Sequence, residues 1–371
     1  MKKKLWIIVA IVVVIAAIAF AFHPHHGAEN PDGKPVVKIG AILPLTGGAA
    51  EIGSAVLNGA KLAIAEINAD AGNKYFYQLI VEDIGQDAKK APAIYAKMRD
   101  IDGVSAITTS NSATGLVLRD MATHDKILNL SPATNQDIAD KKFNYIYSYD
   151  IDETFKTLTE HLKKRGMKTI AVATTTTEAS SYLIPFLEKH LKSVGIKIAH
   201  KTGFMPDERD FKINAAKIIK SNPDIVFLYA NEPGLSLFAE QLRQTGYAGP
   251  MTTSLMFPYG ANPELFEGQE FVDYALGCTG DFVQRYSDKF GTAPKSVAAG
   301  QYDNIMLMHL MAEKFGMWSE WDASDVEPRL KEVIKGYSGA NGQLHINSHG
   351  IIYSAPVMKV MKNGQPVPVK E

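Results

Sequence analysis

The chain alternates short apolar, β-branched segments with helical patterns, and this alternation narrows the choice of fold more than any other feature. Residues 36–43 and 77–83 have strand character, and the stripe from Val56 to Ile67 between them has helical spacing. Strands that alternate with helices favour a parallel sheet joined by right-handed crossovers. The sequence therefore predicts an α/β fold.

The same alternation of strands and helices occurs twice along the chain. A second series of strands and helices begins after Asp150 and runs to about residue 254. A chain of 371 residues is also long enough for about two domains. The segments that follow are too short for a third domain, and we expect them to complete the first two. Among these segments, residues 339–345 and 351–361 are predicted to form a β pair.

Two neighbouring strands, predicted at residues 104–109 and 126–130, each end in a loop rich in serine and threonine. In open α/β sheets, ligands bind at the carboxyl ends of the strands. Ser112 or Thr114 would begin the next helix, whose free N–H groups favour an anion such as a carboxylate. The alternative is that these residues are ordinary helix caps with no ligand.

Composition excludes several classes of function. The formal charge is −1, with no clustered basic stretch that would indicate nucleic-acid binding. Cys278 is the only cysteine, which rules out an intrachain disulfide and a cysteine-based zinc site. His345 and His349 fall in a predicted β and turn region, so we expect no metal there. Nucleophile, zinc-protease and phosphate-loop motifs are absent, and we expect neither an enzyme nor a cofactor.

The N-terminus predicts export. Lys2, Lys3 and Lys4 precede an uncharged stretch at residues 5–22, so the rest of the chain is sent outward. Residues 19–21 fit a cleavage site, yet the stretch is also just long enough to span a membrane. Residues 1–27 are therefore a signal peptide or a signal anchor, and residues 28–35 a linker. We expect a periplasmic or extracytoplasmic protein that contacts the membrane only through an uncleaved N-terminal segment.

Several short motifs share an order and spacing with a known family; they lie at residues 39–47, 58–68, 110–115, 131–134, 299–303 and 339–350. In these the chain resembles the periplasmic substrate-binding proteins of the Leu/Ile/Val-binding type, which serve ABC importers. The resemblance implies two Rossmann-like lobes with parallel sheets, three hinge crossovers and a ligand cleft between the lobes. A membrane permease is the implied partner. A ligand-sensing module with the same clamp is the alternative.

The resemblance also implies a division of the chain. Lobe 1 would comprise residues 36–150 and 278–348, and lobe 2 residues 151–277 and 349–371. The three crossovers would then fall near Asp150, Gly277 and His349. The lobes would close around the ligand by a hinge motion.

The ligand-binding residues carried over from the family come from both lobes. The carboxylate of the ligand would be held by the loop at residues 110–114, with main-chain and hydroxyl groups of the next loop beside it. The implied residues are Thr46, Ile52, Ser110, Ser112, Thr114, Ala133 and Thr134 from lobe 1, and Ser181, Tyr182, Asn231, Glu232 and Ser254 from lobe 2.

Two departures from the family pattern bear on the ligand. The acidic residue that often follows the strand ending near Ser254 is missing, and Glu232 could replace it as partner of an ammonium group. Residues 174–178, Thr-Thr-Thr-Thr-Glu, stand where aspartate and aromatic residues are common, and could equally be a solvated loop. An amino acid is the ligand that the family implies; an amide, a keto acid or an aromatic carboxylate would also fit.

Overall fold

The computed structural model describes residues 30, 33–274 and 280–369. A seven-stranded sheet with the order β13-β14-β5-β4-β3-β1-β2 forms the core of the first lobe, and its strands are parallel except for β13. The strands are β1 (Val36–Leu43), β2 (Phe76–Asp83), β3 (Ala106–Thr109), β4 (Leu128–Pro132), β5 (Asn144–Tyr147), β13 (His345–Ile346) and β14 (Ile351–Tyr353). The predicted α/β class is confirmed.

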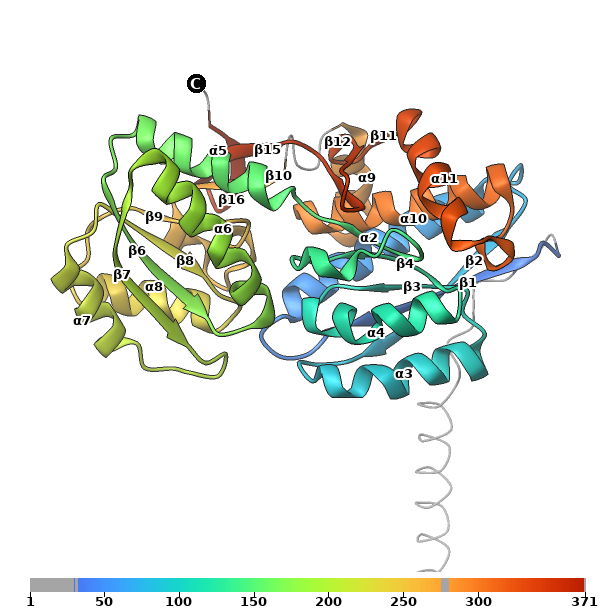
Figure 1. The fold of residues 1–371 in the computed structure, drawn as a ribbon, viewed down its shortest axis with the longest axis horizontal. Coiled ribbons are helices and arrows are strands. Elements are labelled where there is room, and N and C mark those ends of the chain that lie inside the picture. The colour runs from blue at the N-terminus through green and yellow to red at the C-terminus, as the bar shows by residue number, and fades with distance from the viewer. Residues whose placement is uncertain (1–29, 31–32, 275–279, 370–371) are drawn as a thin grey trace, which may run out of the picture.

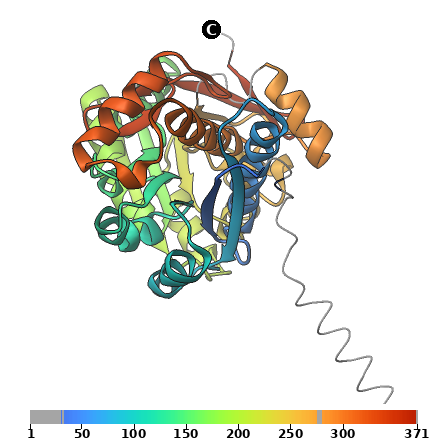
Figure 2. The ribbon, with the colours of Figure 1, turned by 90° about the vertical axis from the view of Figure 1, so that its right-hand side faces the viewer.

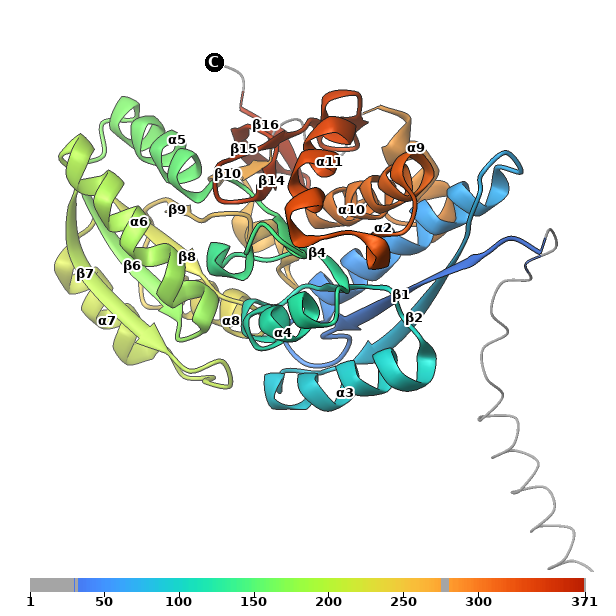
Figure 3. The same ribbon diagram turned by 45° about the vertical axis from the view of Figure 1, so that its right-hand side comes forward.

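Helices cover both faces of this sheet. In Figure 3, α2 and α10 lie above the strands, with α3 and α4 below them. The apolar stripe of α2, including Val56 and Ile67, is buried, as its helical spacing predicted. The helices are α2 (Ala50–Ala69), α3 (Ala91–Lys97), α4 (Ser112–His124), α9 (Asp281–Phe290), α10 (Ser296–Phe315) and α11 (Ala323–Lys335).

The second lobe is built on a four-stranded parallel sheet with the order β7-β6-β8-β9. All five residues of β8 are buried, because helices cover both faces of a parallel sheet. Figure 1 shows this lobe beside the first, and Figure 2 shows the two in line, one behind the other. Its elements are α5 (Ile151–Lys164), β6 (Thr169–Thr175), α6 (Glu178–Val194), β7 (Lys197–Phe204), α7 (Lys212–Ser221), β8 (Ile225–Tyr229), α8 (Gly234–Gln244) and β9 (Met251–Thr252).

The C-terminal strands differ from the prediction. Residues 351–361 do not pair with residues 339–345 as one hairpin, because the segment is divided between two sheets. β14 continues the first sheet beside β5, whereas β15 (Pro356–Lys362) joins β10 (Glu270–Tyr274) and β16 (Gln365–Pro368) in a three-stranded sheet that packs against α5. A separate short hairpin is formed by β11 (Ser338–Gly339) and β12 (Gly342–Gln343).

Because this segment is divided between two sheets, one crossover lies further along the chain than expected. The chain passes from the first sheet to the three-stranded sheet after Tyr353, so the crossover expected near His349 lies four residues or more further on. Near Asp150, the chain leaves the first sheet at Tyr147, the end of β5, and α5 begins at Ile151. The crossover expected near Gly277 lies outside the described residues.

The predicted leader at residues 1–27 and Cys278 also lie outside the described residues. Within the part of the chain that the structure describes, no helix is both long enough and apolar enough to cross a membrane.

Asp303 is a buried carboxyl that joins distant parts of the first lobe. Its Oδ1 accepts hydrogen bonds from the Tyr337 hydroxyl and the Ala340 N–H, both at 2.7 Å, and its Oδ2 accepts one from the Tyr147 hydroxyl at 3.1 Å. These bonds connect α10 to the end of β5 and to the β11–β12 hairpin. Burial nevertheless raises the pKa of the Asp303 carboxyl to about 6.

The raised pKa of Asp303 predicts a pH-dependent stability. A carboxyl whose pKa is higher in the folded chain than in the unfolded chain stabilises the fold at low pH, and this is lost as the pH rises through the folded value. The free energy of unfolding of the wild type, relative to Asp303→Asn, should therefore fall by about 2 kcal/mol between pH 4 and pH 7. Denaturant unfolding at the two pH values measures this difference, and equal values would contradict it.

Candidate functional site

A cleft of about 330 Å³ lies between the two lobes, at the carboxyl ends of their strands. The first lobe contributes the loops that follow β1, β3 and β4, and the second lobe those that follow β6 and β8. Residues close to the crossovers, including Ser148, Tyr149 and Tyr274, complete the lining. This is the edge of the sheets where open α/β folds bind their ligands.

The helix α4 points its N-terminus at the cleft. Asn111 caps it, because the Asn111 side chain accepts hydrogen bonds from the N–H groups of Ala113 at 2.9 Å and Thr114 at 3.2 Å. The prediction that Ser112 or Thr114 would begin the helix is therefore confirmed for Ser112, which is its first residue. Thr114 is buried in the first turn and does not line the cleft.

Ser112 joins the two loops that were expected to hold a carboxylate. Its Oγ accepts hydrogen bonds from the N–H groups of Thr134 at 3.3 Å and Asn135 at 3.1 Å. The Ser112 O–H hydrogen is then free to point toward the cleft. Ser110, two residues earlier, lines the cleft with a buried Oγ that has no hydrogen-bond partner among the described residues. The N-terminus of α4 and these hydroxyls together suit an anion.

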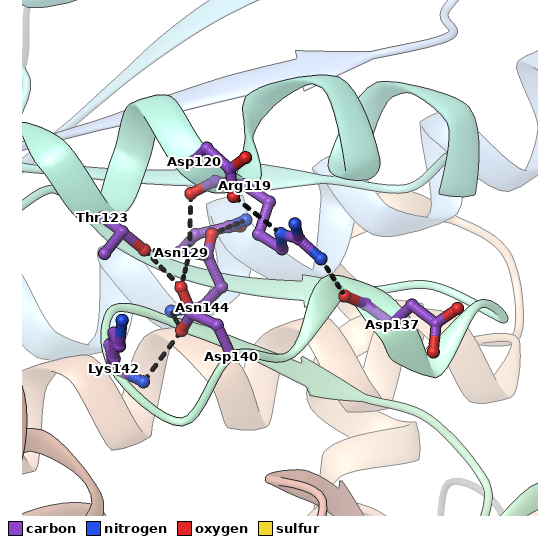
Figure 4. A network of polar contacts seen from close by, with 8 residues as sticks. All are labelled: Arg119, Asp120, Thr123, Asn129, Asp137, Asp140, Lys142 and Asn144. Carbon is purple, nitrogen blue, oxygen red and sulfur yellow. Dashed lines mark hydrogen bonds and ion pairs between the residues drawn. The ribbon is translucent and has the colours of Figure 1, made fainter.

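A polar network fixes the loop that follows β4 (Figure 4). At its centre, the Asn144 side chain donates to the Arg119 carbonyl at 2.9 Å and accepts from Asn129 Nδ2 at 2.9 Å. Arg119 also donates to the Asp137 carbonyl at 3.0 Å, and the Asp140 carboxylate accepts from the Asn144 N–H at 3.0 Å. This network fixes both ends of the loop that carries Ala133, Thr134 and Asn135.

The second lobe also points a helix N-terminus at the cleft. Thr177 caps α6 by accepting a hydrogen bond from the Ser180 N–H at 3.2 Å, and Glu178 is the first residue of the helix. The apolar pattern of residues 182–194 alone predicts a helix that begins four residues later, at Tyr182. Within residues 174–178, Thr174 and Thr175 are buried, Thr177 and Glu178 are half-buried and only Thr176 is exposed, so the run is not a solvated loop.

Glu178 is an acidic group inside the cleft that the sequence interpretation did not select. One oxygen of its carboxyl, Oε1, accepts a hydrogen bond from the Asn135 side chain of the first lobe. The other, Oε2, is buried and has no hydrogen-bond partner among the described residues. Desolvation by burial raises the pKa of the Glu178 carboxyl above its ordinary value.

Three tyrosines form the floor of the cleft and were also missed. Tyr149 and Tyr274 stand in a T-shaped contact with ring centroids 5.9 Å apart, and the Tyr229 hydroxyl lies 3.5 Å from the Thr134 hydroxyl across the cleft. Burial raises the pKa of all three hydroxyls, so they stay neutral and can donate hydrogen bonds. A tyrosine at the end of a strand, as in β8, is the sequence signal by which these residues could have been identified.

Glu232 lines the cleft, but its carboxylate is engaged elsewhere. It accepts hydrogen bonds from the Ser236 hydroxyl at 2.5 Å, the Ser236 N–H at 3.3 Å and the Ala261 N–H at 2.7 Å. These contacts hold the first turn of α8 and the loop at Ala261. The Glu232 carboxylate therefore has fewer acceptor positions left for the ammonium group of a ligand than the sequence interpretation expected.

The structure brings seven of the twelve predicted binding residues together around the cleft: Ile52, Ser110, Ser112, Ala133, Thr134, Asn231 and Glu232. The other five, Thr46, Thr114, Ser181, Tyr182 and Ser254, do not line it. The Thr46 hydroxyl donates to Asp83 at 2.7 Å, Ser181 is exposed, Tyr182 packs against Phe186, and Ser254 is buried.

The charged side chains among the described residues that line the cleft are all acidic. Among the described residues that line it, the ionisable acids are Glu178 and Glu232, and none is lysine, arginine or histidine. The described residues also contain no group of three or more histidine, cysteine, aspartate or glutamate side chains that could hold a metal ion. An anionic group of a ligand would have to be held by N–H and hydroxyl donors.

The two lobes, with a cleft between them at the edges of their sheets, have the architecture of a binding protein. The chain belongs to the periplasmic binding protein family, whose model matches residues 36–365. This is a family of binding proteins, which agrees with the prediction that the chain is not an enzyme.

Individual relatives are distant. The leucine-specific-binding protein of Salmonella typhimurium is 27% identical over 269 residues, which cover 70% of this chain and 68% of that protein. A leucine-binding protein of Thermotoga maritima has a TM-score of 0.79 and 23% identity, covering 90% of this chain and 98% of that one. A solute-binding protein of an ABC transporter from R. palustris, in complex with benzoate, has a TM-score of 0.78 and 15% identity, with coverages of 90% and 95%. The shared architecture confirms the expected fold.

Proposed function

We propose that the chain is the solute-binding component of an ABC importer, acting outside the cytoplasmic membrane, and that it clamps one small polar ligand between its lobes. The ligand is an amino acid or a related carboxylate or amide. Its carboxylate binds at the N-terminus of α4, where Ser110, Ser112 and Thr134 supply hydroxyl groups. The names of the relatives, which bind leucine or benzoate, support this range of ligands.

The main support for the proposal is that residues of both lobes line the same cleft. The N-termini of α4 and α6 line it from opposite sides, and Asn135 of the first lobe donates a hydrogen bond to Glu178 of the second. A ligand that touches both lobes binds better to the closed arrangement than to an open one, and so shifts the population toward closure. The closed protein is the form that a permease partner would recognise.

A thermal-shift screen tests the proposal. Residues 28–371 are melted in the presence of amino acids, amides, keto acids and aromatic acids. A ligand at about 100 times its Kd stabilises the folded chain by about 2.7 kcal/mol, which should raise the melting temperature by several degrees. A panel in which no compound raises the melting temperature would contradict the proposal.

Ser112→Ala tests where the carboxylate binds. The substitution removes a hydroxyl donor to a charged group, a loss of about 1.5–3 kcal/mol, so the Kd should rise about tenfold or more. Ser221→Ala is the matched control, because the Ser221 hydroxyl only donates to the Ile218 carbonyl in α7, at 2.7 Å. Calorimetric titration with the best ligand from the screen measures both variants. Equal affinities for wild type and Ser112→Ala would show that the carboxylate binds elsewhere.

A further inference from the structure

We propose that Glu178 determines which ligands the cleft accepts, by requiring an N–H donor on the part of the ligand that faces α6. This inference rests on the proposed function and narrows it to a class of ligand. The class is a small molecule that carries a carboxylate at one end and an ammonium or amide group at the other. A free keto acid or an aromatic carboxylate lacks the second group.

The first support is the state of the Glu178 carboxyl. It lines the cleft, and its two oxygens differ: Oε1 accepts a hydrogen bond from Asn135, whereas Oε2 is buried without a partner among the described residues. A buried acceptor without a partner is costly, and the cost is removed when a donor arrives. Glu178 therefore favours a ligand with N–H hydrogens at this point.

The second support is the separation of charges along the cleft. The N-terminus of α4 offers N–H and hydroxyl donors on the first lobe, and Glu178 offers a carboxyl acceptor on the second. A ligand with acceptors at both ends would place a carbonyl or carboxylate oxygen against Glu178 Oε2. Since no lysine, arginine or histidine occurs among the described lining residues, no cation is available to offset that repulsion.

The third support is that the other candidate acid is already engaged. Glu232 accepts three hydrogen bonds from Ser236 and Ala261, so its carboxylate has little remaining capacity for a ligand. Glu178 belongs to the run at residues 174–178, the same run that departs from the pattern of the family. The acid missing near Ser254 is thus replaced from a different loop.

Glu178 could alternatively serve only to hold the lobes together through Asn135, and the two roles predict different results. Glu178→Gln keeps an oxygen that can accept from Asn135 but presents N–H hydrogens instead of Oε2. It should therefore change ligand preference. Asn135→Ala removes the contact between the lobes together with the hydrogen bond that the Asn135 side chain accepts from the Asp137 N–H. Neither bond distinguishes one ligand from another, so this variant should weaken all ligands by the same factor.

The test compares ligand pairs that differ in one group. Leucine with 4-methyl-2-oxopentanoate, and phenylalanine with phenylpyruvate, are titrated at pH 8, well above the usual range of a carboxyl pKa. The wild type should prefer the amino acid in a binding pair by about a hundredfold or more, and Glu178→Gln should reduce this preference at least about tenfold. Glu188→Gln is the matched control, because Glu188 lies on the same helix and pairs only at the surface with Lys201. Melting temperatures confirm that each variant folds.

Three results would overturn the inference. A wild type that binds both members of a pair equally would overturn it and leave the proposed function intact. A Glu178→Gln variant that loses affinity by the same factor for both members would assign Glu178 to lobe contact alone. A wild type that binds neither the compounds of the pairs nor any other compound of the wider panel would contradict the proposed function itself, and this inference with it.

Discussion

Replacing Gly48 with alanine is expected to weaken ligand binding by about tenfold to a hundredfold while the chain still folds. Gly48 lies in the loop after β1 of the first lobe, against the backbone of Glu232 in the second lobe. A Cβ at this position would lie 1.8 Å from the Glu232 carbonyl oxygen, a distance that real Cβ atoms do not reach. The lobes could then not approach as closely as they do here.

The size of the effect follows from overpacking. Forcing an extra methyl group into a tight contact costs about 1–3 kcal/mol, and here the cost falls on the closed arrangement alone. In the proposed mechanism the affinity depends on the population of the closed arrangement, so the Kd should rise by the corresponding factor. Gly48 does not have a positive φ, so alanine introduces no backbone strain when the lobes are apart.

Calorimetry with the best ligand from the screen measures the effect. Gly336→Ala is the matched control, because Gly336 also lacks a positive φ and a Cβ there would meet no atom closer than 4.0 Å. Both variants should melt within a few degrees of the wild type when no ligand is added. An unchanged Kd for Gly48→Ala would mean that binding does not require the lobes to meet at this contact.

Asp273→Ala should destabilise the chain by about 3–5 kcal/mol, because it leaves a buried lysine without its partner. Asp273 in β10 and Lys359 in β15 form a buried ion pair at 2.8 Å, and Asp273 also accepts from the Ser296 hydroxyl at 3.0 Å. Ser296 begins α10 of the first lobe. The pair therefore joins two strands of the three-stranded sheet and, through Ser296, ties that sheet to the first lobe.

A double variant separates the charge effect from simple loss of packing. Asp273→Ala with Lys359→Met removes both charges, and a buried pair replaced by apolar groups often costs little. The single variant should melt roughly 5–10 °C below the wild type, and the double variant should recover most of that loss. A double variant that is no more stable than Asp273→Ala would show that packing, and not the unpaired charge, is responsible.

Much of the fold could be predicted because its signals are local. The long, mostly apolar pattern that ends at Gly316 predicts a helix over residues 296–315, and these are the observed bounds of α10. β5 and β10 were missed, because polar residues, Asn144 in β5 and Glu270 and Asp273 in β10, leave no continuous apolar run in these short strands. The break between β14 and β15 was also missed, although Pro356 at the start of β15 is a residue that usually begins or interrupts a strand.

The candidate site was predicted less completely, because its members come together only through the fold. Ser110, Ser112 and Thr134 were selected from their positions at the ends of strands. Glu178 was overlooked because four successive threonines precede it, and the sequence does not show which of them caps α6. The engagement of Glu232 by Ser236 and Ala261 likewise depends on contacts that no spacing in the sequence reveals.

Closure of the lobes on a ligand is the central claim, and a distance measurement across the cleft tests it most directly. Spin labels are attached at Asp120→Cys in α4 and Ile213→Cys in α7, two exposed positions on different lobes, in a chain whose single cysteine is removed by Cys278→Ser. Saturating ligand should shorten the mean distance between the labels and narrow its distribution. A distribution that stays the same when the ligand is bound would contradict the account.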